Sequence, residues 1–238
     1  MKFTLLYCMQ EFIEHIPIAT TLFSIYFAYN IINHYQAKPS KYVLWWTIGV
    51  LTFGAGTLAE SINALFGFNT INLKYWYIVG ALLGGFPLAQ GSVYLLMNKK
   101  FANVAAVIVV TIVAVASVFV ILTPVALPNH FDGKLTGKVF EWTWVRLFSP
   151  FINIYSFIFL VGGAIYSAFY YFKKANEKVK FKSNILIAIG ALLPGIGGTF
   201  TRMGYVEVLY ITEFIGLILI FLGYSSIKNY NRQNVSFA

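Results

Sequence analysis

Long apolar runs dominate this sequence of 238 residues, and each is about as long as a bilayer is thick. A helix of about 20 apolar residues spans the hydrocarbon core of a membrane. Backbone polar groups in that core must be satisfied within their own segment, which favours helices. The sequence is only 11% charged, whereas soluble domains carry about 25% charged residues. The pattern therefore predicts an all-α, polytopic membrane protein.

We predict seven spanning helices that form a single transmembrane domain over residues 1–238. Their expected bounds are Phe12–His34, Val43–Phe66, Tyr75–Met97, Phe101–Thr123, Phe148–Phe172, Asn184–Thr201 and Val206–Ile227. The longest connection is Pro124–Arg146, and loops of that length are often functional lids or are mobile. The first ten residues lack the apolar core of a cleavable signal peptide, so the first helix is expected to act as an uncleaved insertion signal.

The distribution of basic residues predicts the orientation in the membrane. Most of the 17 Lys and Arg residues fall on one side of the predicted topology. They are Lys38, Lys41, Lys99, Lys100, Lys173, Lys174, Lys178, Lys180, Lys182, Lys228 and Arg232. Cytoplasmic loops carry such an excess, so the N-terminus is expected outside and the C-terminus in the cytoplasm of a cell-membrane protein. This topology accounts for the net charge of +9, and nucleic acid is rejected as a partner.

Two carboxylates are predicted to lie inside the membrane. Glu60 lies one to two turns from the outer end of the second predicted helix, and Glu213 lies about two turns into the seventh. An ionised carboxylate at such depth costs a few kcal/mol or more unless it is paired, hydrated or protonated. Residues of this kind usually face the bundle interior or a water-filled cavity. Glu60 is therefore expected to face inward, towards another polar group.

Other polar residues gather near the same outer ends. Glu11, Glu14 and His15 share one face of the first helix, because they are spaced i, i+3 and i+4. Arg146 and Arg202 are the available counter-charges. We interpret Glu14, His15, Glu60, Arg146, Arg202 and Glu213 as the lining of an outward-opening ligand pocket. For the residues near water, such as Glu14, ion pairs that lock the helix ends are the alternative interpretation.

The sixth predicted helix contains the sequence Leu193-Pro194-Gly195-Ile196-Gly197-Gly198. Proline removes a backbone hydrogen bond, and glycine disfavours the helix interior. We therefore expect a kink or break at Pro194 and Gly195, serving as a hinge. Gly80 and Gly84, in the third helix, are spaced as small residues at a close helix–helix contact.

No motif in the sequence names a reaction, a cofactor or a metal. The single cysteine, Cys8, cannot form an intrachain disulfide, and no Cys/His metal spacing occurs. A carboxylate metal site using Glu14, His15 and Glu60 is geometrically compatible with the sequence, but the spacing does not demand it. The cofactor stays unassigned, no metal is predicted, and whether the protein is an enzyme stays open.

The stretch from Gly54 to Leu95 resembles the seven-transmembrane sensor region of some prokaryotic histidine kinases. The residues that carry the resemblance are Glu60, Lys74, Trp76, Gly80 and Pro87. The chain is also similar to uncharacterised stand-alone seven-helix proteins of prokaryotes. It departs from the kinases after the seventh helix, where about ten residues follow. The resemblance implies ligand sensing through the membrane, with signalling left to a separate subunit.

The sequence thus favours a membrane protein that binds a small molecule, lipid or ion in an outer pocket, as a sensor or accessory subunit. Its expected partners are the lipid bilayer, a membrane protein or a small-molecule ligand. Three alternatives stay open. They are an enzyme acting on lipid or isoprenoid with Glu60 or Glu213 as acid or base, a proton- or ion-coupled transporter, and a subunit of a respiratory complex.

Overall fold

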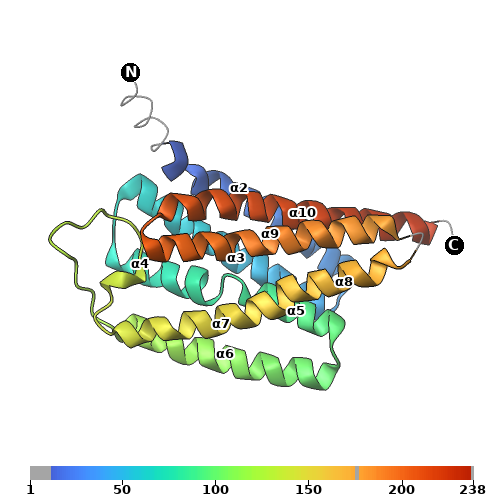
Figure 1. The fold of residues 1–238 in the computed structure, drawn as a ribbon, viewed down its shortest axis with the longest axis horizontal. Coiled ribbons are helices and arrows are strands. Elements are labelled where there is room, and N and C mark those ends of the chain that lie inside the picture. Colours follow the sequence, from blue (N-terminus) through green and yellow to red (C-terminus); the bar gives the residue numbers. More distant parts are fainter. Residues whose placement is uncertain (1–11, 175–176, 237–238) are drawn as a thin grey trace.

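The computed structural model describes residues 12–174 and 177–236. Figure 1 shows an elongated bundle of helices that run roughly parallel to its long axis. Its helices are α2 (Ile16–Ala37), α3 (Lys41–Phe66), α4 (Thr70–Trp76), α5 (Phe86–Leu96), α6 (Lys99–Leu122), α7 (Phe148–Ser156), α8 (Gly162–Phe172), α9 (Lys178–Met203) and α10 (Val206–Ser236). Two π-helical segments, η1 (Tyr77–Leu82) and η4 (Phe157–Val161), and two 3-10 turns, η2 (Gly137–Val139) and η3 (Thr143–Leu147), complete the fold.

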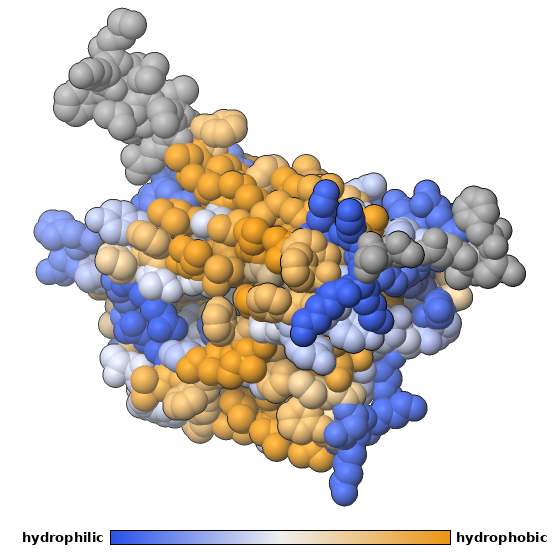
Figure 2. All heavy atoms as spheres, turned by 45° about the vertical axis from the view of Figure 1, so that its right-hand side comes forward, coloured by the Kyte–Doolittle hydropathy of each residue, from blue (hydrophilic) through white to orange (hydrophobic). Residues whose placement is uncertain are grey.

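Seven helices of the described residues are long and apolar enough to cross a membrane. They are Phe12–Ala37, Lys41–Phe66, Thr70–Leu96, Lys99–Leu122, Thr143–Phe172, Lys178–Met203 and Val206–Gln233. The predicted seven-helix, all-α class is therefore confirmed. Figure 2 shows the corresponding surface, on which a broad hydrophobic band separates hydrophilic residues at the two ends.

Close packing of glycines joins α9 to α10. A Cβ built on Gly190 would lie 2.6 Å from the Gly216 carbonyl oxygen, and one on Gly197 would lie 2.1 Å from the Thr212 hydroxyl. Small residues let helices in a membrane approach in this way. The αL conformation of Gly204, with φ of 107°, ends α9 and allows the tight turn into α10.

The break expected at Pro194 and Gly195 is absent, because α9 continues from Lys178 to Met203 through Pro194. The Pro194 ring packs on α10, with its Cδ 3.0 Å from a Cβ built on Gly216. The carbonyl oxygen of Gly190 loses its usual donor, because proline has no N–H. That oxygen lies against Gly216 instead. Packing on α10 thus holds the helix through the proline.

The third span is the one that is interrupted. The π-helical segment η1 ends at Leu82, and the chain leaves the helix over residues 83–85 before α5 begins. Pro87 lies in the first turn of α5, where its missing N–H costs little. Gly80 makes the predicted close contact, since a Cβ on Gly56 of α3 would lie 3.2 Å from the Gly80 Cα. Gly84 lies in the non-helical residues 83–85.

The long connection between α6 and α7 folds back onto the bundle, and we call residues 124–146 the cap. An isolated antiparallel bridge pairs Val125 with Phe140. The side chains of Leu135, Phe140 and Val145 are at most 2% exposed and belong to the same apolar cluster as residues of α4 and α5. The cap covers one end of the molecule, which we call the cap end (Figure 1).

Candidate functional site

Glu60 lies on the inner face of α3 and is 2% exposed. Its Oε1 accepts a hydrogen bond of 2.9 Å from the Trp76 indole N–H of α4. Its Oε2 is also buried, and no group of the described residues donates to it. The predicted inward orientation of Glu60 is therefore confirmed. Trp76 was not among the expected partners, because sequence alone does not give the relative rotation of α3 and α4.

Glu213 of α10 is the second member of the site. Its carboxyl group lies within hydrogen-bonding range of the Glu60 carboxyl group. The residue as a whole is partly exposed, but its Oε2 is buried without a hydrogen-bond partner. Two buried carboxyl oxygens, one on each residue, thus lack a donor. The expectation that Glu213 is a neighbour of Glu60 is confirmed, and we call the two residues the carboxyl pair.

Hydroxyl groups of α2 and α3 lie beside the carboxyl pair and satisfy one another. The Thr21 hydroxyl donates to Thr57 Oγ1 at 3.0 Å and lies 3.2 Å from Ser61 Oγ. Thr57 and Ser61 also bond backbone carbonyls of their own helix. This network joins α2 to α3 without supplying a donor to the carboxyl pair. The unmatched acceptors of the pair therefore differ from the hydroxyl groups beside them, which all have partners.

Tyr210 lies one turn before Glu213 on α10, and the charges of several acidic residues act on it. Glu14, Glu60, Glu207 and Glu213 all lie close enough to act electrostatically on its hydroxyl. Glu14 is partly exposed, and His15 is exposed at the start of α2. Glu11 lies outside the described residues. Glu14 thus approaches the site from the first span, as expected.

Arg146 and Arg202 do not act as the expected counter-charges. The ion pairs of the described residues are Lys134–Glu207 and Lys180–Glu177. Both arginines instead lie close enough to Tyr77 of η1 for their charges to act on its hydroxyl. The predicted pocket therefore divides into a buried carboxyl pair and a separate pair of cations.

The cap is tied to both helices that carry the carboxyl pair. The Asn63 side-chain amide of α3 donates to the Gly133 carbonyl at 3.0 Å, and Lys134 pairs with Glu207 of α10. Asn63 lies one turn beyond Glu60, and Glu207 lies under two turns before Glu213. The same short segment of the cap thus joins the ends of the two helices that carry the pair. The cap is therefore tied to both helices at this end.

A surface hollow of about 430 Å³ lies beside the cap. His130, Asp132, Lys138, Thr201 and Gly204 are among its lining residues. None of the six predicted pocket residues lines it. Since neither Glu60 nor Glu213 lines it, this hollow is distinct from the carboxyl pair.

The described residues do not form a metal centre, since no group of three or more His, Cys, Asp and Glu among them could hold a metal ion. The compatible site of Glu14, His15 and Glu60 is thus not assembled. His34 lies at the other end of the bundle, where its Nδ1 is 2.7 Å from the Tyr224 hydroxyl.

Seven spanning helices and a girdle of apolar surface define this chain as a multi-pass integral membrane protein. Comparison with protein-family models, with curated proteins and with solved structures finds no match to the chain.

Proposed function

We propose that this protein binds and releases a proton at the Glu60–Glu213 carboxyl pair and acts as a membrane sensor. The observation that carries the proposal is the contact between two buried carboxyl groups, each with an oxygen that has no donor. Two like charges in a low-dielectric site cannot both ionise without a large penalty. A single proton shared between the two groups removes the repulsion and supplies the missing donor.

The surroundings of the pair favour sensing over transport. The cap joins α3 and α10 at the cap end, so a change in the distance between the two carboxyl groups is passed to Asn63 and Glu207. Towards the other end, the apolar side chains of Phe27, Val50 and Leu217 fill the core. A proton that reaches the pair thus meets packed hydrocarbon beyond it. The resemblance to the sensor region of histidine kinases supports the same class of function.

Infrared difference spectroscopy of the protein in lipid nanodiscs tests proton binding. A pH step should change a carboxylic C=O band in the wild-type protein. Glu60→Gln and Glu213→Gln should each shift this band, and the double variant should lose it. Glu141→Gln is the matched control, because Glu141 is exposed in the cap. A band that persists unchanged in the double variant would contradict the proposal.

Two further measurements separate a sensor from a transporter. Hydrogen exchange of residues 124–146 should depend on pH in the wild-type protein and lose that dependence in the double variant. Proteoliposomes with an internal pH indicator should show the same proton flux for the wild-type protein and the double variant, because a sensor does not carry protons across the membrane. A sustained flux that the double variant abolishes would replace the sensor by a proton-coupled transporter.

A further inference from the structure

One face of α9 is covered in one half of the membrane and open in the other. Ala191, Gly195, Gly198 and Arg202 share this face, because they are spaced i, i+4, i+7 and i+11. Ala191 packs against an apolar cluster that includes Leu160 of η4. Nothing lies within 4 Å of a Cβ built on Gly195 or Gly198. The face is therefore uncovered from Gly195 to the cap end.

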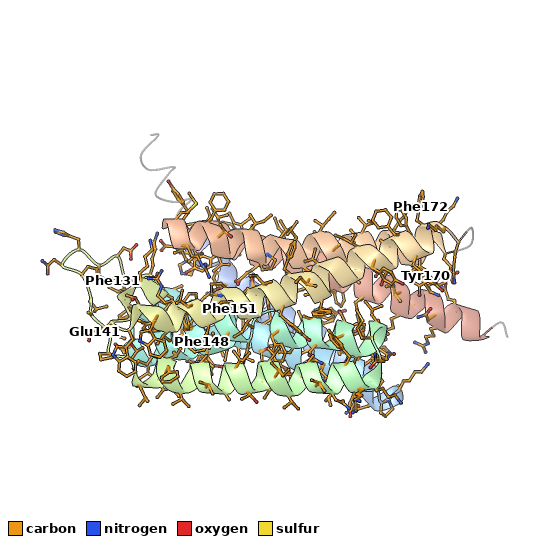
Figure 3. The ribbon with its side chains drawn as sticks, turned by 60° about the horizontal axis from the view of Figure 1, so that its bottom comes forward. Phe131, Glu141, Phe148, Phe151, Tyr170 and Phe172 are labelled. Carbon is orange, nitrogen blue, oxygen red and sulfur yellow. The ribbon has the colours of Figure 1, made fainter. Side chains whose placement is uncertain are left out.

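The opening arises because α7 and α9 diverge. The helix α9 packs on α8 and η4, whereas α7 is not among the elements that contact it extensively. Figures 1 and 3 show the two helices separating towards the cap end. In Figure 3, Phe148 and Phe151 lie on the diverging part of α7, whereas Tyr170 and Phe172 lie at the far end of α8. We call the space beside Gly195 and Gly198 the α7–α9 opening.

Two cations stand at the cap end of this opening. Arg202 ends the open face of α9 and is exposed. Arg146 precedes α7 and is partly exposed. The charges of both arginines act on the hydroxyl of Tyr77 in η1. Neither forms an ion pair with a carboxylate of the described residues.

The helix α7 also carries an exposed polar group at membrane depth. Pro150 and Asn153 lie on one side of α7, because they are spaced three residues apart, and Arg146 precedes the helix in η3. Asn153 is exposed, and its Nδ2 donates to Ser149 Oγ at 3.1 Å. An amide within a spanning segment is favoured where it meets polar partners.

We propose that the α7–α9 opening binds an anionic phospholipid. Its phosphate lies between Arg146 and Arg202, and an acyl chain lies against Gly195 and Gly198. Arginine is suited to phosphate, because its planar guanidinium group donates several hydrogen bonds in a fixed geometry. Two cations without carboxylate partners give the required charge complementarity at the membrane interface. This inference stands apart from the proton site and does not depend on it.

Native mass spectrometry of the detergent-solubilised protein, titrated with phosphatidylglycerol, tests the proposal. Wild-type protein should retain one phosphatidylglycerol more tightly than phosphatidylcholine. The double variant Arg146→Gln/Arg202→Gln should weaken this binding at least about tenfold. The matched control Lys74→Gln/Lys138→Gln removes two other cations of the cap end and should leave the affinity unchanged. Equal losses in the two double variants, or equal binding of the two lipids, would overturn the proposal.

A second pair of variants tests the chain-binding wall. Gly195→Leu/Gly198→Leu keeps both arginines, fills the opening and should abolish phosphatidylglycerol retention. Folding is checked by thermal unfolding, and the open space beside both glycines predicts that it is preserved. Inorganic phosphate at millimolar concentration should not displace the lipid. Displacement by phosphate, or full retention in the folded leucine variant, would show that no lipid occupies the opening.

Discussion

The indole N–H of Trp76 donates a hydrogen bond to one oxygen of the buried Glu60 carboxyl group. The contribution of this hydrogen bond to stability can be measured separately from that of the aromatic ring. Trp76→Phe keeps an aromatic ring and removes the N–H that donates to Glu60 Oε1. Leaving a buried acceptor unsatisfied costs about 1–3 kcal/mol. We expect a lower thermal unfolding temperature in detergent. Trp142→Phe, at a 37% exposed position, should change that temperature little, and equal effects of the two substitutions would contradict the assignment.

Two glycines in α9 and α10 should respond in opposite ways to the same substitution. A Cβ at Gly216 would lie 2.6 Å from the Gly190 carbonyl oxygen, whereas one at Gly195 would meet nothing within 4 Å. Overpacking of this kind costs about 1–3 kcal/mol, and alanine is favoured over glycine in an exposed helix by up to about 1 kcal/mol. Gly216→Ala should therefore destabilise the protein, and Gly195→Ala should be neutral or stabilising, in the same thermal assay.

At the scale of elements, the cap should loosen when its two ties are removed. Asn63→Ala removes the hydrogen bond to Gly133, and Lys134→Gln removes the ion pair with Glu207. Faster hydrogen exchange should follow in residues 124–146, while α6 and α9 exchange as before. His130→Gln is the control, since His130 is exposed in the same segment. Unchanged exchange in the double variant would mean that the apolar contacts of Phe140 and Val145 alone hold the cap.

The spans could be predicted because each is encoded by its own apolar run, and the approximate depths of Glu60 and Glu213 follow from counting turns to the helix ends. Interruptions of helices could not be predicted in the same way. Pro87 and Pro194 each have a glycine within two residues. The chain nevertheless leaves the helix before Pro87 and continues as a helix through Pro194. The difference comes from α10, whose Gly216 accommodates the Pro194 ring and the Gly190 carbonyl.

The partners within the site depend on helix rotation, which a single sequence does not encode. Trp76 meets Glu60 through the packing of α4 on α3, and the charges of Arg146 and Arg202 act on Tyr77 instead of forming ion pairs with the carboxyl pair. The cap was beyond prediction for another reason. It has no periodic pattern, and its position depends on single contacts such as that of Gly133 with Asn63.

At the scale of the whole molecule, the orientation in the membrane follows from charge. The cap lies at one end of the apolar band, and the basic loops that include Lys38, Lys99 and Lys173 lie at the other. Because loops rich in Lys and Arg stay in the cytoplasm, the cap should face the outside, where a carboxyl pair beneath it can respond to external pH. The chain offers one native cysteine, Cys8, so Cys8→Ser provides a background for single-cysteine labelling.

In that background, Asn129→Cys places a thiol in the exposed part of the cap, and Gln36→Cys places one at the exposed end of α2. A membrane-impermeant maleimide should label the first variant in intact cells and the second only after permeabilisation. Both positions are exposed, so a difference in labelling reports the side of the membrane instead of burial. Labelling of Gln36→Cys alone in intact cells would reverse the orientation, and the cap and the carboxyl pair would then report on the cytoplasm.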